Sequence, residues 1–351
     1  MTLRLNYISN FILFICSVSL FISCSRTVKQ ENGYTVLKGK FLDEKYEIAY
    51  DSTIDLGQLV DSLIKESVAQ LSSSTPNSIV FKYNSNQAIS AAQSVFFHNN
   101  VHYLQNFDSI CTNLILKTEG RFNPGLGQLE QYWFEIFKNN DKTEWSKSIS
   151  DSLKKLDFGL GIEFNNLIPL KPNQQKQIWT DPILGGCIAD KIAVLFDSVY
   201  GFKHYYINIA GTIKAKGGNG TDAFWPIKIE KPQINTQKII HFAEIPLKNY
   251  AISTKTNFRK FHFLKGHRYS LALDALEGYP AKNEILSVSI QAPSALEATS
   301  VALACQVIGL EKSKVLVESN PNLKAFIIFE KDGILEHWAT SNISFVLNTK
   351  E

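Results

Sequence analysis

The chain has 351 residues, of which 44% are hydrophobic and 20% are charged. This composition is typical of a folded globular protein and excludes a fibrous, collagen-like or disordered chain. The formal net charge of +3, from 36 basic and 33 acidic residues, is too balanced for a nucleic-acid binder, so we expect no nucleic-acid partner. One large domain or two closely packed lobes both fit this length, because single cores stop growing near about 250–300 residues.

The first 23 residues have the pattern of a secretory signal peptide, in which basic Arg4 precedes an apolar run that ends at small Ser23. Residues 21–24 resemble a bacterial lipobox, in which the cysteine becomes the lipid-modified first residue, although Phe21 stands where leucine is usual. We therefore predict a signal peptide over 1–23, lipidation of Cys24, a tether over 24–34 and a folded domain over 35–340.

Two other N-terminal arrangements stay open. One is a cleaved signal without a lipid, and the other is a retained anchor helix at the short end of the about 17–25 residues that span a bilayer. All three arrangements place the domain outside the cytoplasm. With the lipid, we expect a protein anchored to a bacterial membrane in the cell envelope, on the periplasmic side or at the cell surface.

The first half of the domain predicts a strand and two helices. Residues 46–50 alternate between apolar and polar in the manner of a strand. Apolar residues recur at helical spacing over 54–71, and the Ser, Thr and Pro of 72–77 end this amphipathic helix. A second helix is predicted from Asp108 to near Gly120, and residues 138–180 are predicted to form polar surface with short strands.

The second half predicts a loop and helix over 181–200, strands over 205–209, 225–230 and 285–291, and a helix from Pro293 to Ile308. Ser294 and Glu297 have capping-box spacing at the start of that helix, and Gly309 marks its end. Two strands are predicted over 325–329 and 335–346. Strands and helices alternate without a regular βαβ period, so we predict an α+β fold.

Three cysteines lie in the domain: Cys111, Cys187 and Cys305. Their spacing matches no metal site and no C-x-x-C motif. We expect buried free thiols, because free cysteine behaves as a small hydrophobic residue. One disulfide is the alternative in an oxidising compartment.

The segment 118–129, which reads Thr-Glu-Gly-Arg-Phe-Asn-Pro-Gly-Leu-Gly-Gln-Leu and is followed by Trp133, resembles the pattern T-x-G-x-F-D-P-T-x-G-P-L…W of the FAD:protein FMN transferases, the ApbE family. Further matching segments occur in the family's order: 78–84, 186–190, 208–211, 225–232, 274–280 and 298–309. The resemblance spans residues 35–332 and implies the family's mixed, two-lobed α+β fold.

The resemblance also implies an activity. Members of the family are exported, often as lipoproteins, and use FAD and a divalent cation such as Mg²⁺ to attach FMN to a Ser or Thr hydroxyl of an acceptor protein. This reaction is attack of a hydroxyl on the FAD pyrophosphate, in which a metal would neutralise the charge that develops on phosphate. Carried over to this chain, the motifs imply a catalytic role for Asp274, metal binding at Thr299, and cofactor binding by Asn208, Gly211, Gly186, Thr254 and Gly278.

The segments that would hold the metal depart from the family pattern. The helix start A-D-x-x-x-T, whose Asp and Thr bind the metal in the family, has Thr299 and Leu303 at those positions. A neutral hydroxyl is a far weaker ligand for a hard cation than a carboxylate, and leucine has no donor atom. The strand end V-N-x-G-G-D finishes here in Thr212, and the family's lysine on the central helix is Gly185.

A further segment, H-x-x-D-P-x-T-G, keeps only Asp274 and Gly278. Asp274 could equally be a turn aspartate, and Asn208 with Gly211 could be a strand-end turn. Two hypotheses follow. The first is an exported, lipid-anchored transferase with a rearranged site, and the second is a catalytically dead pseudoenzyme that holds a flavin nucleotide or a partner protein. The residues favour loss or impairment of catalysis. An unrelated α+β envelope protein is the third alternative.

Overall fold

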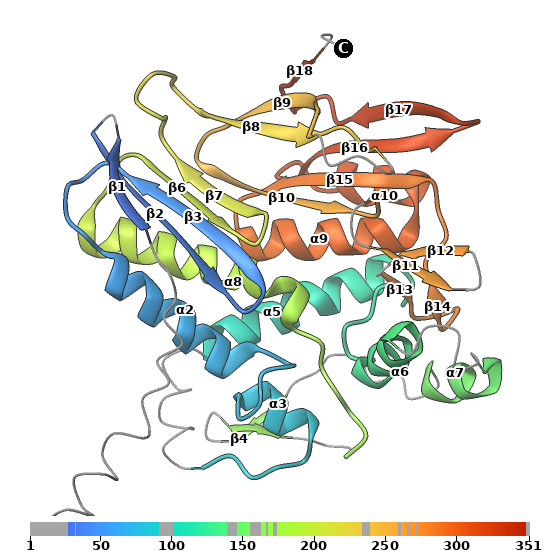
Figure 1. The fold of residues 1–351 in the computed structure, drawn as a ribbon. Coiled ribbons are helices and arrows are strands. Elements are labelled where there is room, and N and C mark those ends of the chain that lie inside the picture. The colour runs from blue at the N-terminus through green and yellow to red at the C-terminus, as the bar shows by residue number, and fades with distance from the viewer. Residues whose placement is uncertain are drawn as a thin grey trace, which may run out of the picture.

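A computed structural model describes residues 27–31, 33–90, 101–138, 146–154, 163–165, 168–170, 174–233, 239–258, 261–264, 267–270 and 272–348. Within them lies one large sheet in which every neighbouring pair of strands is antiparallel (Figure 1). In spatial order its strands are β1 (Thr27–Glu31), β2 (Tyr34–Phe41), β3 (Glu44–Tyr50), β6 (Tyr205–Ile209), β7 (Thr212–Lys216), β10 (Tyr250–Thr256), β15 (Ile285–Ala292), β16 (Lys324–Lys331) and β17 (Ile334–Ala339).

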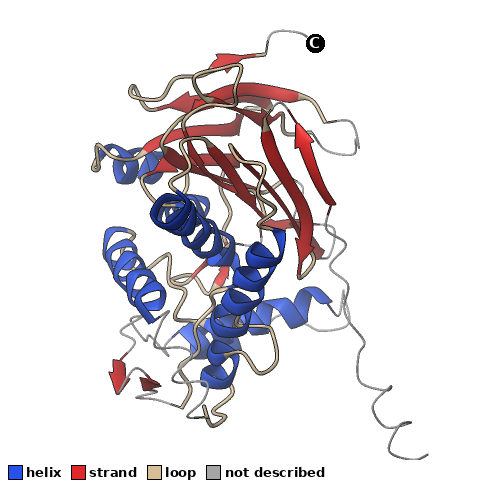
Figure 2. Ribbon diagram, turned by 90° about the vertical axis from the view of Figure 1, so that its left-hand side faces the viewer, coloured by secondary structure: helices blue, strands red, loops and turns tan. Residues whose placement is uncertain are grey.

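Two helices cover one face of this sheet (Figure 2). They are α8 (Asp181–Leu195), which continues into the π-helical turn η1 (Phe196–Tyr200), and α9 (Ala295–Ile308). Both are apolar on nearly every side, which suits helices packed between the sheet and a second layer of helices. That second layer contains α2 (Gly57–Leu71) against α8 and α5 (Val101–Lys117) against α9, and α10 (Leu310–Glu318) follows α9.

The opposite face of the sheet carries a second, smaller sheet of β8 (Trp225–Glu230), β9 (His241–Leu247) and β18 (Val346–Leu347). Because side chains alternate along a strand, each strand of the large sheet serves both cores. Ile207 packs toward the helices, whereas its neighbour Tyr206 packs toward the small sheet. Which face a residue occupies therefore decides whether it can reach α9.

A smaller cluster lies beside the helical layer and forms a second lobe. It contains α6 (Gly127–Lys138), α7 (Lys147–Lys154) and the short pair β13 (Leu273–Asp274) and β14 (Tyr279–Pro280). Trp133 is buried at its centre, stacks edge-on against Tyr279 at 4.8 Å between ring centroids, and donates its indole N–H to the Gly278 carbonyl at 3.0 Å. The remaining elements are α3 (Ile79–Asn84), β4 (Glu163–Asn165), β5 (Ile168–Leu170), β11 (Phe261–Leu264) and β12 (His267–Ser270).

The α+β prediction is confirmed, and so are the helices predicted over 54–71 and 293–308. The Ser294 hydroxyl accepts a hydrogen bond from the Glu297 N–H at 3.0 Å, as the capping box predicts, and Gly309 ends the helix with a φ of +79°. The three domain cysteines are buried free thiols, as expected.

Several boundaries differ from the prediction. The second helix begins at Val101 rather than at Asp108. Strand β1 lies inside the range predicted as a tether; all of its residues are exposed, so no apolar pattern marks it in the sequence. The signal residues 1–23 and Cys24 lie outside the described residues. No described helix is both long and apolar enough to cross a bilayer.

Candidate functional site

The first candidate residue, Thr299, belongs to a chain of buried hydroxyls between α9 and the sheet. Its Oγ1 donates to the Ala295 carbonyl at 2.8 Å and lies 3.0 Å from Thr212 Oγ1, which in turn lies 3.1 Å from Ser253 Oγ. A hydroxyl has one proton to donate. Thr299 gives its proton to Ala295, so it accepts from Thr212, and Thr212 accepts from Ser253.

This hydroxyl chain joins the two positions at which the resemblance implies carboxylates. Thr299, Thr212 and Ser253 are at most 1% exposed, so the chain is closed to water. Every hydroxyl proton in it has an acceptor, and all three groups are neutral. The chain therefore satisfies its own hydrogen bonds without a cation.

Mg²⁺ does not fit the residues present here. Thr299 offers a fully buried, neutral hydroxyl in place of a carboxylate, and Leu303, one turn further along α9, offers no oxygen. Mg²⁺ is normally held by one or two carboxylates together with water and phosphate oxygens. In the part of the chain that the structure describes, no three His, Cys, Asp or Glu side chains are grouped closely enough to share a metal.

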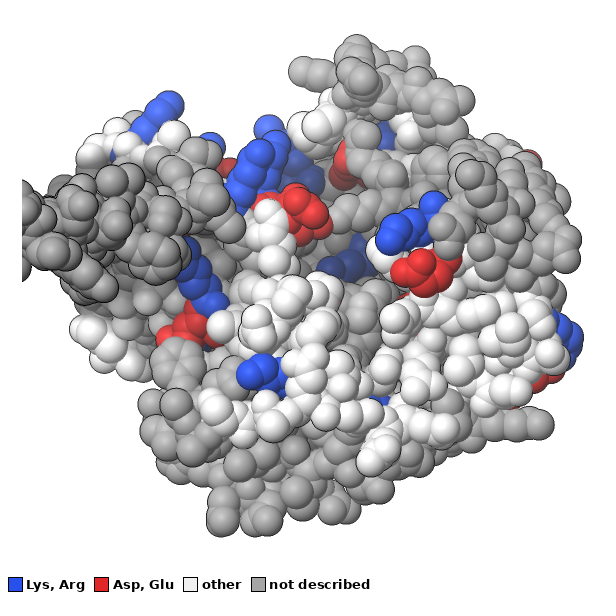
Figure 3. All heavy atoms as spheres, turned by 60° about the horizontal axis from the view of Figure 1, so that its bottom comes forward, with Lys and Arg blue, Asp and Glu red and all other residues white. Residues whose placement is uncertain are grey.

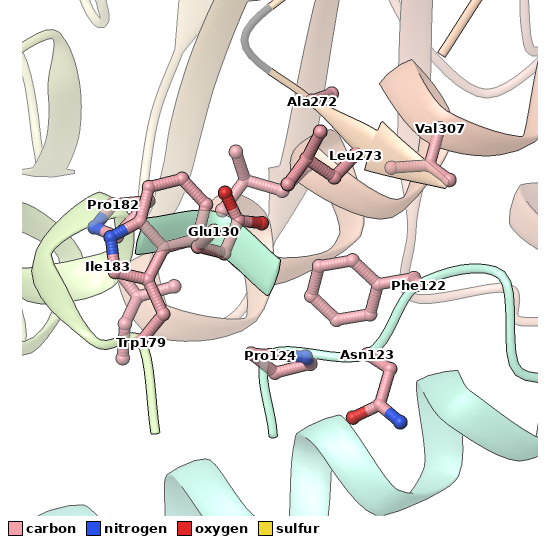
Figure 4. A pocket seen from close by; sticks show the side chains of 11 residues that line it. Phe122, Asn123, Pro124, Glu130, Trp179, Pro182, Ile183, Ala272, Leu273 and Val307 are labelled. Carbon is pink, nitrogen blue, oxygen red and sulfur yellow. The ribbon is translucent and has the colours of Figure 1, made fainter. Parts of the chain in front are cut away.

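Leu303 instead lines a narrow apolar pocket between α9, the start of α8 and the segment before α6 (Figure 4). The cavity has a volume of about 40 Å³, which is room for a small head group, whereas dinucleotide-sized ligands need pockets of about 300–1,000 Å³. It is lined by Phe122, Asn123, Pro124, Glu130, Trp179, Pro182, Ile183, Ala272, Leu273, Leu303 and Val307.

Glu130 is the one residue of this lining with an ionisable side chain, and sequence reasoning missed it. Figure 4 shows its carboxyl group beside the Trp179 ring and turned toward Leu273. Burial alone raises the pKa of this carboxyl well above its usual range. No sequence motif singles out Glu130, because it lies in a helix at a position where the family pattern has no required residue.

Asp274 lies outside this lining. One of its oxygens forms an ion pair with Arg121, and the other accepts hydrogen bonds from the N–H groups of Leu276 at 3.0 Å and Glu277 at 3.2 Å. The Asp274 side chain is 8% exposed. These contacts are those of a turn aspartate that also ties the second lobe to the segment before α6, and they favour the structural alternative over catalysis.

Asn208, near the end of β6, and Gly211, in the turn, are both part of the β6–β7 hairpin. The Gly211 N–H donates to Asn208 Oδ1 at 3.1 Å, and the Asn208 amide nitrogen donates to the Tyr206 hydroxyl at 3.2 Å. Ala210 and Gly211 both have positive φ, at +52° and +80°, as a two-residue hairpin turn with the twist of its strands requires. Gly211 is therefore needed by the turn itself.

Thr254 lies on the other face of the sheet from Thr299. It is the neighbour of Ser253 on β10, and its hydroxyl pairs with Ser289 at 2.8 Å across to β15. Asn208 is likewise on the face away from α9, because it alternates with Ile207 and Ile209, which pack against the helices. The predicted cofactor residues and the predicted metal residue thus do not converge on one described cavity.

Gly186 lies in the contact between α8 and α9. A Cβ at this position would be 2.7 Å from the Ala295 carbonyl oxygen, so only glycine lets the two helices approach this closely. Gly185 is similarly tight, because a Cβ there would be 2.7 Å from the Ile209 carbonyl oxygen. A lysine at 185, as in the family pattern, would require the backbone to move.

Asp190, one turn further along α8, fixes the beginning of α9. Its two carboxylate oxygens accept hydrogen bonds from the N–H groups of Ala295 at 2.8 Å and Leu296 at 2.9 Å. Burial raises the pKa of Asp190, while these two N–H donors act in the opposite direction.

Gly278 has a φ of +66° and lies where the second lobe closes. Its carbonyl accepts hydrogen bonds from Trp133 Nε1 and from the Ser150 hydroxyl, and these two donors come from α6 and α7.

Figure 3, which brings the bottom of Figure 1 forward, shows basic and acidic side chains mixed around a hollowed face.

The fold and the motif order agree with known proteins. The ApbE family matches residues 42–327. A curated FAD:protein FMN transferase from Buchnera aphidicola subsp. Schizaphis graminum is 28% identical over 360 residues, which covers 98% of this chain and 99% of the relative. One from Haemophilus influenzae is 23% identical over 361 residues, which covers 96% of this chain and 98% of the relative.

Among solved structures, flavin transferase ApbE from Vibrio cholerae superposes with a TM-score of 0.72 at 22% identity, covering 90% of this chain and 98% of that one. At this identity the superposition establishes the fold, and the family match over most of the chain establishes the relationship. The chain belongs to the ApbE family, the family of the FAD:protein FMN transferases.

Proposed function

We propose that this chain is a member of the ApbE family in which metal-assisted transfer of FMN from FAD is lost or strongly impaired. The observation that carries the proposal is the hydrogen bond of 3.0 Å between Thr212 and Thr299. These are the two positions where the resemblance implies carboxylates, and here they satisfy each other as neutral hydroxyls.

The chemistry of the transfer explains why this exchange matters. Attack on a pyrophosphate builds negative charge on the phosphate oxygens, and a bound cation supplies several kcal/mol of stabilisation at that point. At positions 299 and 303 the chain has a neutral hydroxyl, which donates to the Ala295 carbonyl, and an aliphatic side chain. It would bind FAD, or an acceptor protein, without the group that lowers the barrier.

The test is an assay of AMP release from FAD by the full-length chain in detergent, with Mg²⁺ and then with EDTA. The Vibrio cholerae flavin transferase, given the same acceptor protein, is the positive control. We expect no Mg²⁺-dependent AMP release from this chain, and such release would overturn the proposal. Calorimetry on the same samples distinguishes the two inactive alternatives. FAD binding without turnover identifies a flavin-binding protein, whereas no FAD binding indicates that the chain binds a partner protein only.

Restoring the ligand set tests the cause. The triple variant Thr212→Asp, Thr299→Asp and Leu303→Thr rebuilds the oxygens of the family motifs, and we expect Mg²⁺-dependent AMP release to appear. The matched control, Thr299→Ser, keeps the hydroxyl chain and should stay inactive. Gly185→Lys is left out, because its Cβ would lie 2.7 Å from the Ile209 carbonyl oxygen.

We further propose that the protein is exported and anchored to a membrane of the cell envelope through a lipid on Cys24. Support comes from the signal-like residues 1–23 and the lipobox-like residues 21–24. Metabolic labelling with an alkyne fatty acid should mark the wild-type chain and leave Cys24→Ser unmarked. Equal labelling of both chains, or none of either in a host that labels its own lipoproteins, would contradict the anchor.

A further inference from the structure

The pocket around Glu130 contains an ionisable group that the proposed function does not use. The carboxyl lies in a cavity of about 40 Å³ with aromatic and aliphatic walls. No side chain or backbone group of the described residues pairs with it, and burial raises its pKa well above the usual range. A half-buried carboxyl that lines a cavity without a partner is costly, so it marks a place where a ligand could add stability.

The basic side chains on the segments next to the pocket interact with groups other than Glu130. On segments that adjoin the lining, Arg121 pairs with Asp274 and Lys255 donates to the Pro182 carbonyl at 3.3 Å. Asn123, the other polar side chain of the lining, accepts the Gly125 N–H through Oδ1 at 2.9 Å. Glu130 therefore faces the cavity as its one charged group.

The walls complement a cation. Trp179 and Phe122 contribute aromatic rings to the lining, and aromatic faces attract ammonium groups when the site is desolvated. An ammonium group beside Glu130 would pair its charge and contact these rings at the same time. A neutral ligand would leave the carboxyl unpaired, and an anion would be repelled.

We propose that this pocket binds an alkylammonium group through Glu130, Trp179 and Phe122. The volume suits an ammonium head with a short alkyl stem, which could belong to a free amine or to a lysine side chain of a partner protein. The pocket shares Leu303 with the site of the proposed function, but the inference concerns binding of an ammonium group and not transfer of FMN, so either can hold without the other.

The probe is n-butylammonium, titrated into the full chain and followed by calorimetry and by quenching of tryptophan emission. Its neutral analogue, 1-butanol, is the control for apolar binding. We expect n-butylammonium to bind and Glu130→Gln, which keeps the shape but removes the charge, to weaken binding about tenfold or more. Glu135→Gln, on the exposed side of the same helix, should bind as the wild type does.

A pH series on the wild-type chain gives a second test that needs no variant. Because the ammonium group requires an ionised carboxyl, binding should strengthen as the pH rises through the raised pKa of Glu130 and weaken below it. A blocked tripeptide with central lysine, compared with its norleucine analogue, distinguishes the sources: competition by the lysine peptide indicates a protein side chain, and its failure indicates a free amine.

Three results would overturn the proposal. They are no binding of n-butylammonium by the folded wild-type chain, equal binding by Glu130→Gln, and binding of 1-butanol as tight as that of the amine.

Discussion

Two carboxylates at positions 212 and 299 would lie close together and would need a cation or a shared proton between them. Two hydroxyls at the same positions need no cation, because each donates one hydrogen bond along the chain. Ser253 donates to Thr212, Thr212 to Thr299, and Thr299 to the Ala295 carbonyl. Hydroxyls in place of the family's carboxylates are thus compatible with a chain of hydrogen bonds that is satisfied at Ser253, Thr212 and Thr299.

The hydroxyl chain predicts a cost for Thr299→Val. Without the 299 hydroxyl, one proton of the chain loses its acceptor in a buried place, and the free energy of unfolding should fall by about 1–3 kcal/mol. Urea denaturation measures the change. Thr299→Ser, the control, keeps the hydroxyl and should lose clearly less; equal losses for both variants would show that packing, and not hydrogen bonding, decides stability here.

Glu130 predicts a pH-dependent effect on stability. Its folded pKa lies above its unfolded value, so the native state holds more protons between the two values and stability falls as the pH rises through that window. Glu130→Gln removes the buried charge. Its melting temperature should exceed that of the wild type at pH 8 by a few degrees, or about 1 kcal/mol, and the gain should shrink toward pH 5. A gain that does not vary with pH would contradict this account.

The sequence predicts the role of a single residue where its contacts are with residues close to it in the chain. Ser294 and Glu297 at capping spacing, and Gly309 at the helix end, could be read directly because the contacts involve near neighbours. Glu130 could not, because its environment comes from segments distant in the sequence, such as Trp179 and Leu273. The same distance hid the contact between Thr212 and Thr299.

Among the elements, the contact between α8 and α9 depends on glycine. Gly186→Ala would place a Cβ 2.7 Å from the Ala295 carbonyl oxygen. Overpacking of this kind costs about 1–3 kcal/mol, which outweighs the gain of about 1 kcal/mol from better helix propensity. Thermal denaturation should show a net loss of stability. The control Val194→Ala, at an exposed site of the same helix, should change it by less than about 0.5 kcal/mol, and an equally stable Gly186→Ala would contradict the tight contact.

The elements also show which patterns can be read without a structure. Helix α2 was predictable because its apolar residues repeat at 3.6-residue spacing toward one core. Strand β1 was not, because all five of its residues are exposed. The start of α5 was placed seven residues late, although Asn99 and Asn100 directly precede Val101 and asparagine is a favoured N-cap residue.

For the whole molecule, motif order identified the family more securely than any site residue did. The matching segments include backbone and packing positions such as Gly186, Gly211 and Gly278, each of which has a structural reason to be glycine. A scaffold kept by such positions can persist after its metal ligands are gone. The predicted site residues do not assemble into one cleft, because strand alternation places Thr254 on the face of the sheet away from α9 and Thr299.

The loss of metal-assisted transfer that we propose requires that Thr212, Thr299 and Leu303 leave no binding site for a divalent cation. The most direct measurement is electron paramagnetic resonance of Mn²⁺, a spectroscopic substitute for Mg²⁺, titrated with the full chain and FAD and corrected for Mn²⁺ bound by FAD alone. We predict that the wild-type chain leaves the free Mn²⁺ signal unchanged and that the variant with Thr212→Asp, Thr299→Asp and Leu303→Thr reduces it. Loss of the signal with the wild-type chain, abolished by Thr299→Val, would contradict the account.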